Sequence, residues 1–200
     1  QTSADPTRNI TLGVNLPAAD TITGASGTTW PLKVEYFGNL GTSESLDIEF
    51  TPVISPTSVI SNQWSMVIRD SASAGAVIGS YDIEFDSGMT SGGTISSVTP
   101  AAGYDIATGT LALTVAGGPI VVKIGRPGDP NGLTQLSADF APTRISKDGS
   151  PVGNLAGVEI DQNGFIRATY DTGFIRTLYQ IPLVDVPNPN GLVPYDNQTF

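Results

Sequence analysis

The sequence contains no histidine and no cysteine among its 200 residues. Their absence excludes Ser-His-Asp and Cys-His nucleophilic centres, zinc sites of the Cys/His type, disulfide bonds and histidine-based pH switches. A catalytic centre would have to be built from carboxylates and from three lysines that lie in unrelated parts of the chain. We therefore expect a protein that is not an enzyme and holds no cofactor.

Charge is sparse and mostly of one sign. Charged residues make up 14% of the chain, and 9 Lys and Arg against 19 Asp and Glu give a net charge of −10 and a pI near 4.1. Such a chain repels phosphate backbones and anionic lipids, so nucleic acids and membrane surfaces are not expected as partners.

Long apolar runs are missing as well. The longest, such as Ile120 to Val122, are only a few residues, far short of the ~20 that a membrane-spanning helix needs. Residues 1–20 lack the basic start and apolar middle of a secretory signal, so we expect that a signal has been removed or that export uses another route.

Alternation of apolar and polar residues recurs along almost the whole chain. Hydrophobic residues, at 39%, are enough for a core, while 23 Gly and 15 Pro make turns dense and long helices improbable. A period of two is typical of strands with one buried face. The alternating segments are 10–16, 46–50, 81–85, 111–115, 120–124 and 158–161.

Two turn sequences predict a meander near the end of the chain. Asp161-Gln162-Asn163-Gly164 should close one hairpin and Asp171-Thr172-Gly173 the next, with 165–170 and 174–181 as the paired strands. These patterns predict an all-β fold of antiparallel, sandwich- or barrel-like domains.

One stretch fits two interpretations. Residues 57–74 contain no Gly or Pro, and their apolar positions also fit a helical spacing. We favour a strand at Trp64 to Asp70, because Trp64, Met66 and Ile68 alternate with their neighbours while Ser and Asn are weak helix formers.

Two segments rich in small or turn-forming residues look like linkers, 20–29 and 125–132. They bracket about 100 residues, a common domain size. Residues 1–20 are too few to fold alone and would leave a strand unpaired, so we expect them to join the sheet formed by 133–200.

An acidic row places Asp82, Glu84 and Asp86 on one face of a strand, about 6–7 Å apart. It could be a calcium site or a glycosidase acid/base pair. We favour a solvated outer face, and the same interpretation for Asp47 and Glu49.

Other candidate sites have simpler structural interpretations. The segment Asp161–Gly164 lacks the spacing and the distal Glu of a calcium loop, so a hairpin turn is favoured. Gly117-Gly118-Pro119 lacks the lysine and helix of a phosphate loop and is expected to be a turn. Trp30 and Trp64 could line a sugar-binding groove, but core packing is favoured.

Several linked motifs in the last third of the chain resemble the bacterial flagellar hook protein family. They are 137–140, 147–155, 158–164, 168–173, 178–183 and 186–192, and within them Tyr170, Gln180, Asn188, Gly191 and Leu192 match family-motif positions. Several motifs in the right order are far more specific than any single one.

Upstream, the resemblance is weaker but keeps its order. Residues 10–20, 46–50, 64–70 and 85–88 resemble successive family strands, whereas 37–42 departs from the family's turn. Tyr179 stands where the family usually has Gly. Neither end carries the long apolar helices by which the family forms its inner coiled-coil wall, so we expect a fragment.

The resemblance implies that 1–28 and 133–200 form an inner, discontinuous and incomplete β-domain into which 29–132 is inserted as the outer domain. It also implies a structural subunit that polymerises into a flexible, torque-transmitting tube on the cell exterior, exported without a cleaved signal peptide. The implied partners are copies of itself and the hook cap, rod and hook–filament junction proteins. The fragment alone should be monomeric. The alternative is an extracellular carbohydrate- or surface-binding module, such as an adhesin or phage-tail segment.

Overall fold

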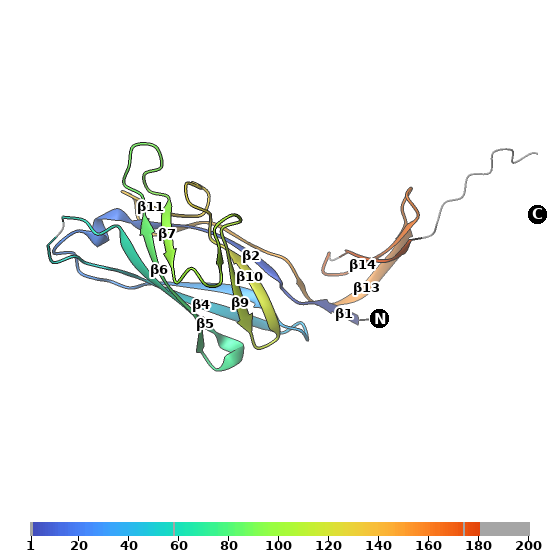
Figure 1. Ribbon diagram of the computed structural model, residues 1–200. Helices are drawn as coiled ribbons and strands as arrows, with labels where there is room; N and C mark the ends of the chain where they lie inside the picture. Colours follow the sequence, from blue (N-terminus) through green and yellow to red (C-terminus); the bar gives the residue numbers. More distant parts are fainter. Residues whose placement is uncertain (1, 58, 174, 181–200) are drawn as a thin grey trace, which may run out of the picture. The chain divides into compact units, whose positions relative to one another are not determined.

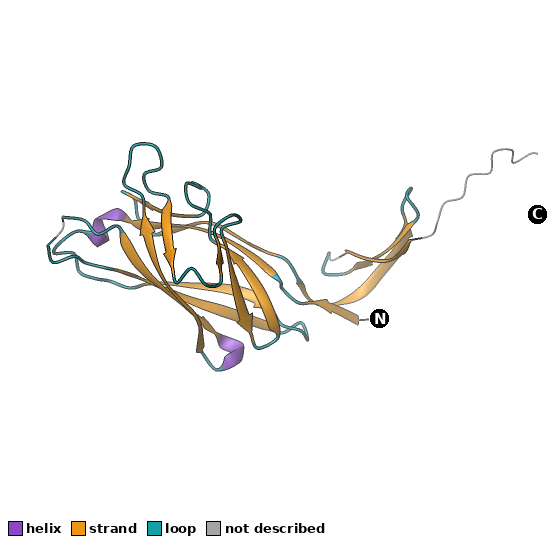
Figure 2. Ribbon diagram, viewed as in Figure 1, coloured by secondary structure: helices purple, strands orange, loops and turns teal. Residues whose placement is uncertain are grey.

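The computed structural model describes residues 2–57, 59–173 and 175–180, and nearly all of its regular structure is β (Figures 1 and 2). This confirms the all-β expectation. The strands are β1 (Thr2–Asp5), β2 (Asn9–Pro17), β3 (Trp30–Phe37), β4 (Ser43–Pro52), β5 (Gln63–Asp70), β6 (Ala76–Phe85), β7 (Ile95–Thr99), β8 (Tyr104–Asp105), β9 (Thr110–Val115), β10 (Gly118–Lys123), β11 (Leu133–Leu136), β12 (Ala141–Lys147), β13 (Ser150–Ile160), β14 (Phe165–Tyr170) and β15 (Ile175–Gln180).

Helical structure in the described residues is limited to two 3₁₀ turns, Ala18–Thr21 and Ser71–Ser73, drawn in purple in Figure 2. No helix among the described residues is long and apolar enough to cross a membrane. The segment that also fitted a helical spacing forms β5, as favoured, with Trp64, Met66 and Ile68 in the core.

One sheet is an antiparallel meander of five strands in the order β3-β4-β5-β6-β7. Every second residue of β4 is buried from Leu46 to Phe50, and β6 buries Tyr81, Ile83 and Phe85. The alternation therefore gives this sheet one apolar face and one face toward solvent.

The other large sheet contains six strands and departs from the purely antiparallel expectation. Strand β2 pairs in parallel with β10 at Asn9–Thr11 and with β11 at Val14–Pro17, and antiparallel with β12. Because β12 overlaps both registers, β10 and β11 occupy the opposite edge of β2 in succession. Alternation of apolar and polar residues identifies strands but does not give their relative direction, so the parallel pairing of β2 could not be predicted from the sequence.

The core lies between the inner faces of these two sheets, as in a β-sandwich. One continuous cluster contains Leu12 and Val122 of the six-stranded sheet together with Ile48, Trp64 and Ile83 of the five-stranded sheet. All five side chains are almost fully buried. Charged residues on the alternate positions therefore face away from this core.

The chain divides into two compact units at other positions than the composition suggested. Ala4–Val152 form one unit, and the described part of the other consists of residues 2–3 and 153–180. Residues 4–28 and 133–152 thus belong with 29–132. The physical reason is the central place of β2, whose buried Asn15 accepts hydrogen bonds from Thr134 Oγ1 and Leu136 N, both at 3.0 Å.

The four-stranded sheet has the order β1-β13-β14-β15. Its hairpins match the expected meander: Gly164 N donates to Asp161 O at 3.0 Å, and Gly173 N donates to Tyr170 O at 2.9 Å. β14 runs antiparallel to both β13 and β15.

Candidate functional site

The acidic row forms part of a solvent-facing strand surface, as favoured. Asp82 and Glu84 are exposed on β6, and Asp86 accepts a hydrogen bond from the backbone N–H of Gly88 in the turn that follows. Among the described residues, no group of three or more Asp, Glu, His or Cys side chains could hold a metal ion. Asp47 lies on the same outer face, 3.5 Å from Lys33 Nζ, and Glu49 is exposed.

The segment Asp161–Gly164 is a hairpin turn. Asp161 Oδ1 accepts the backbone N–H groups of Asn163 and Phe165 at 2.9 and 3.0 Å, and its Oδ2 lies 2.8 Å from Arg167 Nη2. The carboxylate is therefore engaged in holding the turn, which is the role expected of Asp at such a position.

The tryptophans have packing roles. Trp64 is fully buried, and its indole N–H donates to Gln135 Oε1 at 2.8 Å. Trp30 stacks on Phe140, with ring centroids 5.1 Å apart, and donates to Asp20 Oδ2 at 2.7 Å. Trp64 is therefore inaccessible to a ligand, and Trp30 is engaged by Phe140 on one ring face and by Asp20 at its indole N–H, as the packing interpretation expects.

Asp70 is a buried carboxylate that the sequence interpretation did not single out. Its side chain accepts four hydrogen bonds, from Tyr36 Oη at 2.5 Å, Ser73 Oγ at 2.7 Å, Ala116 N at 2.9 Å and Ala72 N at 3.0 Å. The residue is completely inaccessible to solvent. The sequence did contain a signal for this burial, because Asp70 occupies the next inward-facing position after Trp64, Met66 and Ile68.

The surroundings of Asp70 favour its charged form. Burial acts to raise the pKa of Asp70, but the hydrogen bonds from Tyr36, Ser73, Ala116 and Ala72 together hold it below the ordinary value. Burial and the neighbouring carboxylate raise the pKa of Tyr36 well above its usual range. Because Ala116 belongs to the β9–β10 turn, Asp70 joins the two sheets, and its role is structural.

Two further aspartates each hold an asparagine in the same way. Asp148 accepts Asn9 N at 2.9 Å and Asn9 Nδ2 at 2.8 Å, and Asp171 accepts Asn154 N at 2.9 Å and Asn154 Nδ2 at 3.2 Å. For Asp148, burial acts to raise the pKa, but the bonds from Asn9 and Arg8 hold it below the ordinary value. The bonds from Asn154 lower the pKa of Asp171. The Asn9–Asp148 pair joins segments distant in the chain, whereas the Asn154–Asp171 pair lies across the β13–β14 hairpin.

The residues at the family-motif positions lie in different environments. Tyr170 is buried at the end of β14, where it pairs with Leu155. Gln180 is exposed at the end of β15, opposite Phe165. Asn188, Gly191 and Leu192 lie outside the described residues, so the structure brings no common site together from this set.

The segment 125–132 is a compact loop within the sandwich. The two residues that flank the loop are joined by a hydrogen bond from Leu133 N to Ile124 O, 2.8 Å long. A Cβ on Gly132 would lie 2.2 Å from Ile124 O, so only glycine fits there. The flanking strands β10 and β11 both pair with β2, so this segment connects strands of one sheet.

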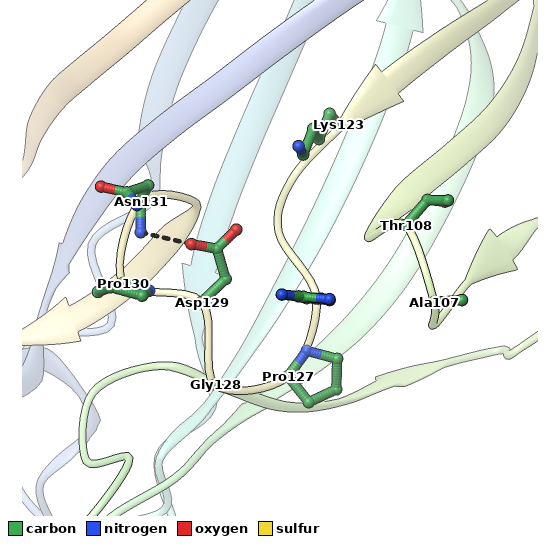
Figure 3. Close-up of a pocket in the computed structure, with 9 residues that line it drawn as sticks. Ala107, Thr108, Lys123, Pro127, Gly128, Asp129, Pro130 and Asn131 are labelled. Carbon is green, nitrogen blue, oxygen red and sulfur yellow. Dashed lines mark hydrogen bonds between the residues drawn. The ribbon is translucent and has the colours of Figure 1, made fainter.

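A polar groove of about 830 Å³ runs beside this loop (Figure 3). It is lined by Lys123 and Arg126, by Asp129 and Asn131, and on its other side by Ala107 and Thr108. Asn131 N donates to Asp129 Oδ1 at 2.9 Å, the bond drawn in Figure 3. The groove contains charged groups but no nucleophile paired with a base.

Comparisons with known proteins give a consistent result. No family model matches the chain. It is 25% identical over 193 residues to the flagellar hook protein FlgE of Brucella suis, which covers 94% of this chain and 41% of that protein. The hook protein FlgE of Borreliella burgdorferi is 24% identical over 98% of the chain and 46% of that protein. That of Caulobacter vibrioides is 34% identical over 71 residues, 36% of the chain and 12% of that protein.

Among solved structures, the flagellar hook protein FlgE2 of Helicobacter pylori matches with a TM-score of 0.52 and 19% identity, over 85% of this chain and 35% of that one. This match shows a shared β fold. The chain spans less than half the length of these relatives. The resemblance indicated by the sequence motifs is therefore confirmed: the chain is similar, over nearly all of its length, to part of the flagellar hook protein FlgE.

Proposed function

We propose that the chain is part of a structural subunit of the bacterial flagellar hook, whose copies polymerise into a curved, flexible tube that transmits motor torque to the filament. The observation that carries the proposal is the similarity to FlgE across 94% of the chain. The two compact units correspond, in this proposal, to the outer and inner β-domains that the resemblance implies.

The surface chemistry supports this role. Tube subunits that slide past one another during bending need contacts with many near-equal arrangements, which small, wet, polar contacts provide better than large apolar ones. The outward positions of β9 are Thr110, Ala112 and Thr114, and those of β7 include Ser97 and Thr99.

The proposed partners are copies of the same chain and the hook cap, rod and hook–filament junction proteins, and the proposed location is the hook outside the cell. A saturable glycan or calcium response in calorimetry would instead favour the surface-binding alternative, which the names of the relatives do not favour.

Electron microscopy of cells lacking the gene tests the proposal. We expect cells without hooks and without swimming, with both restored by the gene in trans. Normal hooks and normal swimming in the deletion strain would end the proposal. The 200-residue chain alone should sediment as a monomer at micromolar concentration, and filaments formed by this chain would contradict that expectation.

A further inference from the structure

The two outer faces of the sandwich carry different charges. On the five-stranded sheet, Glu49, Asp82 and Glu84 occupy positions that alternate with core residues and therefore point outward. On the six-stranded sheet, Ile120 and Val122 point into the core, so Lys123 points outward. The faces lie on opposite sides of the sandwich because both sheets turn their apolar sides inward.

The cations of the second face lack carboxylate partners. Among the described residues, Arg8, Lys33, Lys147 and Arg167 each lie within 3.5 Å of a carboxylate oxygen. No such ion pair is formed in the described part of the chain by Lys123, Arg126 or Arg144, nor by Arg69 and Arg176, which line neither hollow at this loop. In a chain with a net charge of −10, three unpaired cations around one loop are a local concentration of positive charge.

These three cations line adjoining hollows, which we call the basic groove. Lys123 and Arg126 line the polar groove of about 830 Å³, and Lys123 and Arg144 line a hollow of about 140 Å³ beside it. Asp129 lines both hollows and leaves the groove with an excess of positive charge. A concave basic surface of this kind suits carboxylates.

The groove is held in a fixed shape by glycines at its base. A Cβ on Gly109 would lie 2.2 Å from Arg126 N, and a Cβ on Gly125 would lie 3.0 Å from Gly132 Cα. The backbone segments are therefore in close contact, and the loop does not need to be ordered when a partner arrives. Preformed surfaces lose less entropy on binding.

We propose that the basic groove receives the acidic row, Asp82 and Glu84, of a second copy of the chain. Alternate residues of a strand are about 6–7 Å apart, so the two carboxylates can reach separate cations of the groove. The contact joins two different surfaces, and repeated contacts of this heterologous kind generate open helical assemblies unless the rotation closes. The inference rests on the proposed hook function and names the surfaces through which copies meet.

Such a contact is weak by itself. Exposed ion pairs each contribute little, so the pair of chains dissociates at low concentration, as expected for a monomeric fragment. Charged contacts that are wet can also exchange partners without breaking an apolar interface, as bending requires.

A charge-swap experiment on the 200-residue chain tests the inference. The groove variant carries Arg126→Glu and Arg144→Glu, and the row variant carries Asp82→Lys and Glu84→Lys. Self-association is measured by sedimentation equilibrium up to millimolar concentration, at about 20 mM and about 300 mM NaCl. Circular dichroism and tryptophan fluorescence verify that each variant is folded.

We expect the wild-type association constant to fall at least about fivefold at the higher salt concentration, and each variant alone to lose that association at low salt. An equimolar mixture of the two variants should recover it, because each then meets a surface of opposite charge. The row variant is informative by itself: its net charge is closer to zero, so general repulsion predicts more association, whereas the specific contact predicts less. Arg176→Glu, a reversal on the exposed part of β15, should act like the wild type.

The inference is overturned if the wild-type chain shows no salt-sensitive association, if folded variants associate as the wild type does, or if the mixture fails to recover. These results leave the hook proposal intact, because that proposal stands or falls on the hooks of the deletion strain.

Discussion

Replacing Asp70 by Asn should weaken the sandwich although the shape of the side chain hardly changes. The carboxylate accepts two backbone N–H groups, one on each oxygen, besides the hydroxyls of Tyr36 and Ser73. The hydroxyls can rotate and accept from the new amide, but a backbone N–H cannot. Whichever way the amide lies, one buried N–H of Ala72 or Ala116 therefore faces another donor.

The magnitude follows from these bonds. A stranded buried N–H costs about 1–3 kcal/mol, and the other bonds lose the strength that the charge gave them. The amide is easier to bury than the carboxylate, which offsets part of this loss. We expect Asp70→Asn to lower the free energy of unfolding by about 2–3 kcal/mol and Tyr36→Phe by about 1.5–3 kcal/mol.

Asp70 and Tyr36 make the free energy of unfolding depend on pH in opposite directions, Asp70 at acid pH and Tyr36 at alkaline pH. The pKa of Asp70 is lowered in the folded chain, so its contribution is present above the unfolded value near 3.9 and is lost as the pH falls through the lowered value. The pKa of Tyr36 is raised, so its contribution is present below the unfolded value near 10 and is lost as the pH rises from there through the raised value. Asp70→Asn should therefore remove the part of the acid-side loss that Asp70 contributes, and Tyr36→Phe the part of the alkaline loss that Tyr36 contributes, while the lowered pKa values of Asp148 and Asp171 keep their own acid-side contributions.

Urea unfolding followed by tryptophan fluorescence measures these effects, because both tryptophans lie in the unit formed by Ala4–Val152. Asp82→Asn is the matched control, since it makes the same chemical change on an exposed residue and should alter stability by less than about 0.5 kcal/mol. If Asp70→Asn and Asp82→Asn have equal unfolding midpoints, the structural role assigned to the buried carboxylate is wrong.

Three other outcomes are expected. Gly132→Ala should cost at least about 1 kcal/mol more than Gly128→Ala, because its Cβ meets Ile124 O, whereas a Cβ on Gly128 meets nothing and only the positive φ of that residue opposes the change; equal costs in urea unfolding would argue against the close approach of Gly132 to Ile124. Asn154→Ala should raise the pKa of Asp171 part of the way toward its ordinary value, as followed by NMR titration, because it removes the Nδ2 bond and keeps the stronger bond from the backbone N–H; an unchanged pKa would contradict the contribution assigned to the side chain. Gln135→Leu should cost about 1–3 kcal/mol by stranding the indole N–H of the buried tryptophan, and an unchanged midpoint would argue against that bond.

The sequence predicted local features of the fold well. Alternation placed the strands that contain Leu12, Ile48, Ile68 and Ile83, and turn chemistry placed the hairpin at Asp161–Gly164. These succeeded because strand pleating and turn conformations depend on neighbouring residues. The favoured strand at 64–70 was correct for the same reason.

Long-range features were less accessible. Composition cannot distinguish a linker between domains from an excursion inside one sheet, so 125–132 was interpreted as a boundary. Nothing local reports that β2 pairs in parallel with β10 and β11. The basic groove was also missed, because Lys123, Arg126 and Arg144 come together only when β12 returns to β2.

The position of β2 has a consequence for the order in which the chain acquires structure during synthesis. Ile145 pairs with Leu12, so one side of β2 stays without its neighbour until more than 130 further residues have been made. Topologies dominated by such distant pairings fold slowly, because the loop must close before its contacts are gained. A nascent chain ending before Ala141 would therefore leave one edge of β2 without a hydrogen-bonded neighbour, and completion of the six-stranded sheet depends on β12, the last of its strands to be made.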